Sequence, residues 1–148
     1  MHVLVAADAQ WVVDDIVAAL SGPETSFTVC RNGRDVTAVV KARTPDIAIL
    51  DLQSGSMGAM AVTMNLRHDE SSGAIPHVPV LMLLDRDADI FLARRSGAEA
   101  WIVKPLDAMA IARAVQAVLH PPEAEMHDSE LAESELAETV EEEPVSAG

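Results

Sequence analysis

The stretch PDIAILD, residues 45–51, decides the fold, because four consecutive apolar residues stand between Pro45-Asp46 and Asp51. A short unbroken apolar run of this kind is typical of a strand that is buried on both faces of a parallel sheet. The sequence therefore predicts a strand here and at four similar runs, residues 3–7, 27–30, 78–84 and 100–103. The run at residues 27–30 is the weakest of these.

Segments with the apolar spacing of helices separate these runs. Residues 11–20 place Val12, Ile16 and Leu20 on one side, and Ser21-Gly22-Pro23 ends the pattern. Five strands alternating with five helices favour right-handed crossovers and an open, doubly wound α/β sheet with helices on both faces. The other four predicted helices span residues 35–42, 57–66, 89–95 and 107–119.

Charge divides the 148-residue chain into two parts. The whole sequence contains 24 acidic and ten basic residues, a formal net charge of −14. Ten of the acids and none of the basic residues lie in residues 121–148. We therefore expect one domain over residues 1–120, followed by an acidic tail over 121–148 that has too few large apolar residues to fold and is disordered.

Composition also excludes classes of function. No apolar run approaches the length of a membrane span, and the chain does not start like a signal peptide. Cys30 is the single cysteine, so no intrachain disulfide can form and a reducing cytoplasm is the expected location. The acidity and the few aromatic residues argue against nucleic-acid binding. We expect no direct contact with nucleic acid or a membrane.

Polar residues follow three of the predicted strands. In open α/β sheets ligands bind beyond the carboxyl ends of the strands, and Asp8, Asp51 and Lys104 all lie at such ends. Carboxylates bind Mg²⁺, a carboxylate can accept a phosphoryl group, and a lysine can pair with the added charge. The sequence thus indicates a small cation site that handles phosphate. The Lys104-Pro105 bond is a candidate cis peptide.

At these positions the sequence resembles the receiver domain of two-component response regulators, of the atypical, stand-alone, CheY-like kind. The resemblance covers roughly residues 2–120 and is carried by four segments in the family's order: VLVAADAQ (3–10), PDIAILDLQSGSMG (45–58), PVLMLLD (79–85) and GAEAWIVKPLD (97–107). It implies a flavodoxin-like (βα)5 sheet with strand order 2-1-3-4-5.

The resemblance also implies roles for single residues. Asp51 matches the phosphoacceptor, and Lys104 matches the lysine that pairs with the phosphoryl group. Asp8 matches the acid that contacts Mg²⁺ directly, and Gln53 the position whose backbone carbonyl is a further ligand, so the metal set is Asp8, Asp51 and Gln53. Trp101 matches the switch aromatic.

Two positions depart from the family pattern. The family has two adjacent acids at this strand end, and Ala7 stands in place of the first, before Asp8, which weakens the implied Mg²⁺ site. Leu84 stands where a Ser or Thr of the family contacts the phosphoryl group. Asp85, next to Leu84, could substitute for the missing acid, but we interpret it as a cap of the loop that leads into the following helix. Asp8 has the alternative interpretation of an N-cap.

The first functional hypothesis is a single-domain response regulator in a phosphorelay. It accepts a phosphoryl group on Asp51 with Mg²⁺ from a sensor histidine kinase or another phosphodonor and signals to an unknown output protein by contact. It is no enzyme beyond self-phosphorylation and autodephosphorylation, and homodimerisation stays open. The alternative is a phosphorylation-independent pseudo-receiver that acts as a protein-binding module. A nucleotide-binding enzyme is disfavoured, because Asp8-Ala9-Gln10-Trp11 contains no glycine for a phosphate-binding turn.

Overall fold

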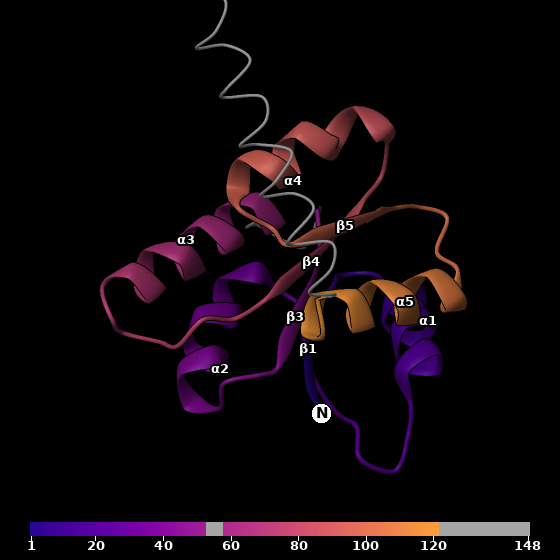
Figure 1. Ribbon diagram of the computed structural model, residues 1–148, viewed down its shortest axis with the longest axis horizontal. Helices are drawn as coiled ribbons and strands as arrows, with labels where there is room; N and C mark the ends of the chain where they lie inside the picture. Colours follow the sequence, from indigo (N-terminus) through magenta and orange to yellow (C-terminus); the bar gives the residue numbers. More distant parts are fainter. Residues whose placement is uncertain (53–57, 122–148) are drawn as a thin grey trace, which may run out of the picture.

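The computed structural model describes residues 1–52 and 58–121 and shows one sheet of five parallel strands (Figure 1). Its strand order is β2-β1-β3-β4-β5, which confirms the order implied by the sequence. The parallel pairing runs through all four neighbouring pairs of strands. The strands are β1 (His2–Ala6), β2 (Ser26–Cys30), β3 (Ile47–Asp51), β4 (Val80–Leu84) and β5 (Ala100–Val103).

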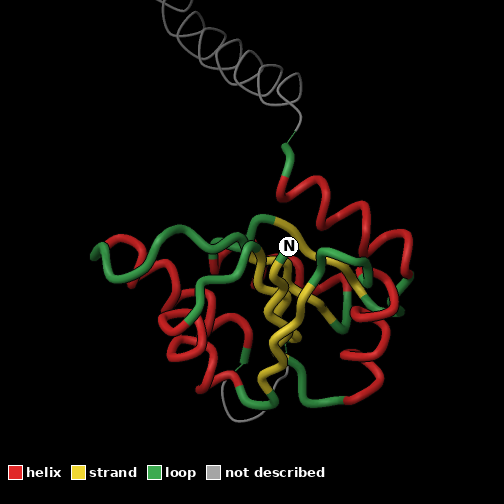
Figure 2. Tube along the Cα trace, turned by 90° about the horizontal axis from the view of Figure 1, so that it is seen from below, coloured by secondary structure: helices red, strands yellow, loops and turns green. Residues whose placement is uncertain are grey.

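Helices cover both faces of the sheet (Figures 1 and 2). Helices α1 and α5 pack on one face and contact each other, while α2, α3 and α4 pack on the other face. Short 3₁₀ turns, η1 (Gly33–Asp35) and η2 (Asp87–Asp89), precede α2 and α4. The helices are α1 (Gln10–Leu20), α2 (Val36–Ala42), α3 (Ala59–Ser71), α4 (Ile90–Ser96) and α5 (Ala108–Leu119).

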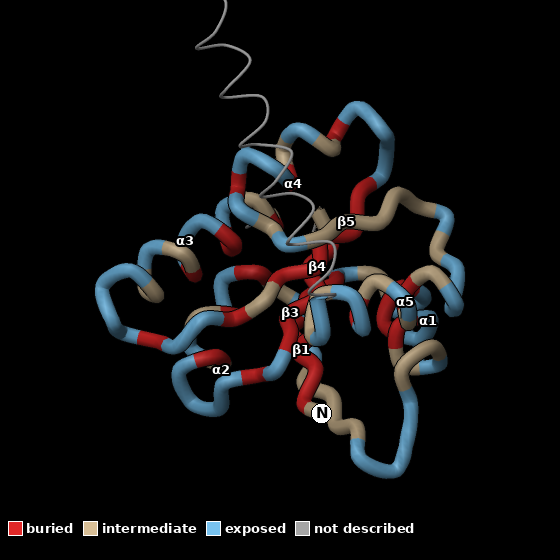
Figure 3. Tube along the Cα trace, in the orientation of Figure 1, coloured by how far each residue is buried: buried red, intermediate tan, exposed pale blue. Residues whose placement is uncertain are grey.

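The strands β1, β3 and β4 form the buried centre of the molecule (Figure 3). Successive side chains of a strand point to opposite faces of the sheet. In β4, Leu81 and Leu83 therefore pack with α1 and α5, whereas Val80, Met82 and Leu84 pack with α2, α3 and α4. Burial on both faces explains why these strands read as continuous apolar runs rather than as alternating ones.

The predicted boundaries differ from the structure by more than one residue at two elements. The strand predicted over residues 78–84 begins at Val80, because Pro79 has no N–H to donate to the sheet. The helix predicted over 57–66 continues to Ser71 as α3. Residue 57 lies outside the described residues, as do Gln53 and the acidic tail beyond Pro121.

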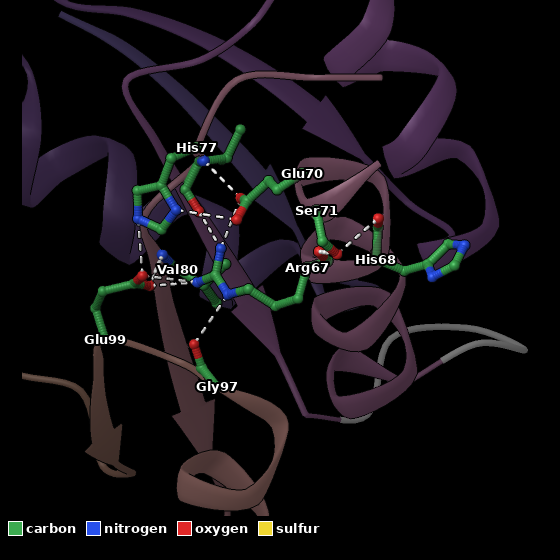
Figure 4. A network of polar contacts seen from close by, with 9 residues as sticks. Arg67, His68, Glu70, Ser71, His77, Val80, Gly97 and Glu99 are labelled. Carbon is green, nitrogen blue, oxygen red and sulfur yellow. Dashed lines mark hydrogen bonds and ion pairs between the residues drawn. The ribbon is translucent and has the colours of Figure 1, made fainter. Parts of the chain in front are cut away.

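Ion pairs fix the end of α3 to the amino ends of β4 and β5 (Figure 4). The guanidinium of Arg67 contacts Glu70 at 2.7 Å and Glu99 at 2.6 Å, and His77 contacts both of these carboxylates. Arg67 also donates to the carbonyls of Val78 and Gly97. These contacts explain why α3 extends over a polar segment that shows no apolar periodicity.

The contacts of Glu70 within this network stabilise its charged form. Burial alone raises its pKa, but the hydrogen bond donated by Val78 N–H, the contact with His77 and the charge of Arg67 outweigh that effect and lower the pKa below its usual range. The network lies at the edge of the sheet opposite the carboxyl ends of the strands. It stabilises the fold without reaching the candidate site.

Across the part of the chain that the structure describes, none of the helices has the length and apolar character needed to span a bilayer.

Candidate functional site

A cavity of about 410 Å³ lies beyond the carboxyl ends of β1, β3 and β4 and beside the first turn of α1. Three of the residues that line it were predicted from the strand ends: Asp8, Asp51 and Lys104. Ala9 and Trp11 were not predicted to belong to the site, and Asp85 was considered only as an alternative to a cap. The lining residues are Asp8, Ala9, Trp11, Asp51, Asp85 and Lys104.

Asp51 and Lys104 form the centre of the site. Asp51 is the last residue of β3 and only 3% exposed. The Nζ atom of Lys104 donates to its Oδ1 at 3.0 Å and to its Oδ2 at 3.1 Å. Lys104 reaches this position because its N–H donates to the carbonyl of Leu84 at 2.8 Å, which continues the pairing of β4 and β5. The Lys104-Pro105 bond is cis, as predicted.

Asp85 belongs to the same cluster. Lys104 Nζ donates to Asp85 Oδ1 at 2.9 Å. The interpretation of Asp85 as a cap is wrong, because Arg86 is the N-cap of η2 and no side chain caps this turn. Burial lowers the pKa of Lys104, but the hydrogen bonds and charges of Asp85 and Asp51 outweigh it and raise the pKa above its usual range. Lys104 is therefore fully charged at neutral pH.

Trp11 forms one wall of the cavity. It lies in the first turn of α1, is 51% exposed, and its ring centroid is 5.6 Å from Lys104 Nζ. At this distance an ammonium is attracted by the face of an indole ring. The signal for this contact in the sequence is the position of Trp11, which follows Asp8 by three residues at the start of a helix.

Asp8 lies between β1 and α1 and is exposed. The alternative interpretation of Asp8 as an N-cap is wrong, because α1 begins at Gln10 with Ala9 as its N-cap and no side chain caps it. Asp8 instead lines the cavity together with Asp51. Carboxylates from the ends of two neighbouring strands therefore border the same space.

This donor set suits a small hard cation. Mg²⁺ is usually held by one or two carboxylates, with waters and phosphate oxygens completing its octahedron. Asp8 and Asp51 match that requirement, whereas Gln53 lies outside the described residues. Among the described residues, no group of three or more His, Cys, Asp or Glu side chains is placed to hold a metal ion. Asp8 and Asp51 thus fit a cation that retains most of its water.

The two departures from the family pattern are both buried apolar residues. Ala7 is fully buried and packs with the cluster under α1 and α5. Leu84 is also fully buried and packs with the cluster under α2, α3 and α4. Neither residue supplies a polar side-chain group to the cavity.

Trp101 lies in β5 next to Met82 of β4, partly buried against the cluster under α2, α3 and α4. The guanidinium carbon of Arg94 in α4 lies 5.3 Å from its ring centroid. Trp101 therefore joins β5 to α4 and does not line the cavity.

An open parallel sheet of this order, with its polar residues gathered at one edge, defines an α/β domain of the flavodoxin-like class. The sequence model of the response regulator receiver domain matches residues 3–116, and the chain belongs to that family. It is therefore the receiver domain of a two-component system.

Individual relatives agree with this assignment. Protein PilH of Pseudomonas aeruginosa is 25% identical over 118 residues, which cover 80% of this chain and 97% of PilH. Other curated relatives are longer, and the chain spans between 24% and 51% of their length.

Solved structures share the fold. A putative response regulator from Chloroflexus aurantiacus superposes with a TM-score of 0.71 at 18% identity, covering 80% of this chain and 96% of that one. The receiver domain of the sensor histidine kinase PA1611 from Pseudomonas aeruginosa, with magnesium in its active site cleft, has a TM-score of 0.66 at 17% identity, with coverages of 80% and 96%.

Proposed function

We propose that this receiver domain, residues 1–120, accepts a phosphoryl group on Asp51 and transmits the change to an output protein by contact. The observation that carries the proposal is the pairing of Lys104 Nζ with both carboxylate oxygens of Asp51 inside the cavity. A carboxylate held in this way presents its oxygens beside a fixed cation, where a phosphoryl group can be neutralised.

The reaction is a phosphoryl transfer. An oxygen of Asp51 attacks the phosphorus of the donor, a phosphohistidine of a sensor kinase or a small acyl phosphate, and the bond from phosphorus to the leaving atom breaks. The leaving group keeps the electron pair, and Asp51 becomes an acyl phosphate. Attack of water on that phosphorus later returns the carboxylate. The domain thus catalyses no reaction beyond its own phosphorylation and dephosphorylation.

Lys104 and the acids of the cavity have different roles in the proposed reaction. The ammonium of Lys104 pairs with the new phosphoryl oxygens. Asp8, Asp51 and the backbone carbonyl of Gln53 would hold Mg²⁺, which supplies further positive charge to the phosphoryl oxygens when it is bound. The magnesium ion in the PA1611 receiver supports this assignment. Ala7 removes one acid, so we expect weak Mg²⁺ binding.

The output step is a shift between two conformations. The added charge biases a pre-existing equilibrium of the domain. Trp101 is the proposed switch aromatic, because it joins β5 to α4 and adjoins the Arg94 guanidinium. A cytoplasmic output protein would bind the face formed by α4, β5 and α5, and homodimerisation is a further proposal.

A pseudo-receiver is the second candidate. It would bind its partner whether or not Asp51 is phosphorylated. The buried apolar side chains of Ala7 and Leu84 favour it, because they replace two polar groups of the family site.

Intact mass spectrometry separates the two candidates. The protein is incubated with acetyl phosphate with and without Mg²⁺, and wild type is compared with Asp51→Asn and with Asp15→Asn, an exposed acid of α1 outside the cavity. We expect a base-labile gain of one phosphoryl group in wild type and Asp15→Asn, dependent on Mg²⁺ and absent from Asp51→Asn. If wild type gains no phosphoryl group, even with a cognate kinase supplied, phosphorylation of Asp51 is refuted and the pseudo-receiver is the remaining candidate.

A further inference from the structure

We propose that Asp85 is a built-in competitor of the phosphoryl group for Lys104, and that its carboxylate restrains phosphorylation of Asp51. Asp85 is a positioning residue in this role, because it acts through Lys104. The inference rests on the proposed function of Asp51 as phosphoacceptor and adds a restraint that is specific to this chain.

The hydrogen-bond capacity of Lys104 is the first argument. An ammonium has three N–H donors. Three carboxylate oxygens lie within hydrogen-bond distance of Nζ: Oδ1 of Asp51 at 3.0 Å, Oδ2 of Asp51 at 3.1 Å and Oδ1 of Asp85 at 2.9 Å. All three donors are therefore used in this structure. A phosphoryl oxygen can bind Lys104 only after one of these contacts breaks.

Exposure decides which contact breaks. The side chain of Asp51 is 5% exposed, whereas that of Asp85 is 35% exposed. Water can solvate Asp85 when it leaves Lys104, and an exposed ion pair contributes little free energy. The contact between Lys104 and Asp85 is the one that the phosphoryl group displaces.

Charge is the second argument. Three carboxylates and a single ammonium line the cavity among the described residues. A phosphoryl group adds about −1.5 to −2 charges at neutral pH. The charge of Asp85 repels both the approaching anionic donor and the product, so its removal should favour both steps.

The competing role for Asp85 is that of a cation ligand in place of the acid missing at Ala7. The geometry favours the Lys104 contact, since the described residues contain no metal-holding group of three such side chains, and Asp85 already accepts from Nζ. The two roles predict opposite effects of neutralising Asp85. A competitor slows phosphorylation, and a cation ligand promotes it.

The test compares phosphorylation rates at saturating Mg²⁺ in wild type, Asp85→Asn, Asp85→Glu and the matched control Asp87→Asn. Asp87 is an exposed acid of η2 outside the cavity. Intact mass gives the rate with acetyl phosphate and with the less negatively charged phosphoramidate. Mg²⁺ affinity is titrated in parallel, and circular dichroism checks that each variant is folded.

We expect Asp85→Asn to accept the phosphoryl group about two- to fivefold faster than wild type, the range that corresponds to an exposed ion pair. The gain should be larger with acetyl phosphate than with phosphoramidate, which a purely structural role would not produce. Asp85→Glu should restore the slow rate, and Asp87→Asn should match wild type.

The other outcomes are distinct. Equal rates in wild type and Asp85→Asn would overturn the inference and leave the proposed function intact. A slower Asp85→Asn with weaker Mg²⁺ binding would overturn it in favour of a cation ligand. No phosphorylation of any variant would refute the proposed function and the inference together.

Discussion

Replacement of Lys104 by methionine tests how strongly the site depends on its ammonium. The variant Lys104→Met keeps a long side chain but removes the donor that contacts both oxygens of Asp51. Removing one partner of a buried ion pair costs about 3–5 kcal/mol, because the other charge stays in a poorly solvated place. Lys104 is 17% exposed and Asp51 5%, so we expect a somewhat smaller loss of about 2–3 kcal/mol.

The two acids should differ in their coupling to Lys104. Asp85 is 35% exposed, and an exposed pair contributes about 0.2–1 kcal/mol. Double-mutant cycles separate the two contributions. The cycle of Lys104→Met with Asp51→Asn should give a coupling of about 2 kcal/mol, and the cycle with Asp85→Asn less than about 1 kcal/mol.

Urea unfolding followed by far-ultraviolet circular dichroism, without Mg²⁺, measures these quantities. With an m-value of about 1–3 kcal/mol per molar urea, the Lys104→Met midpoint should fall by roughly 0.7–3 M. Lys41→Met is the matched control, because Lys41 is an exposed lysine of α2 whose replacement should change stability by less than about 0.5 kcal/mol. A coupling to Asp51 no larger than that to Asp85, or a Lys104→Met loss no larger than the control's, would refute the reasoning.

Three further predictions concern the fold. Folding lowers the pKa of Glu70, so its contribution to stability is present at neutral pH and is lost as the pH falls from the usual glutamate range through the lower folded value. Glu70→Gln should therefore be less stable by about 1–3 kcal/mol at neutral pH and lose less stability in acid, in urea titrations at several pH values. Leu84→Thr should lower the unfolding free energy by about 2–4 kcal/mol, because it removes buried apolar volume and buries a hydroxyl; an unchanged urea midpoint would contradict this. Gly97 ends α4 at φ +89°, and a Cβ would meet Arg67 only at ordinary contact distance, so Gly97→Ala should cost about 1–2 kcal/mol of backbone strain, seen as a lower thermal midpoint.

Much of the fold could be predicted because each strand is buried on both faces. Residues 47–50 read as one apolar run since Ile47 and Ile49 pack under α1 and α5 while Ala48 and Leu50 pack under α2, α3 and α4. The alternation with helices then indicates parallel strands. The strand order came from the family resemblance, because apolar patterns do not say which strands are neighbours.

The centre of the site could also be predicted, but its outer members could not. Asp51 and Lys104 lie at strand ends, and the geometry of parallel sheets brings such ends together. Asp85 lies in a turn, where acids are common for local reasons, so the sequence favoured a cap. Only the tertiary structure places its carboxylate 2.9 Å from Lys104.

The end of α3 shows a similar limit. Arg67 and Glu70 lie in a polar segment whose pattern predicts neither burial nor a helix. Their partners Glu99 and His77 are seven or more residues from Glu70 and come together only when β4 and β5 pair (Figure 4). Long-range ion pairs of this kind leave no periodic signal in the sequence.

At the end of β4, this chain has a carboxylate, that of Asp85, where the family pattern has a hydroxyl, and this changes the charge of the site. A hydroxyl at position 84 would donate to an anion, but Leu84 is buried, and the polar side chain at this end of the strand is the carboxylate of Asp85. The site therefore gains a negative charge where the family pattern has a neutral donor. Lys104, the only cation that lines the cavity within the described residues, is shared between two acids. Since one ammonium cannot neutralise both these acids and a phosphoryl group, we expect the proposed phosphorylation of Asp51 to require a bound divalent cation in addition to Lys104.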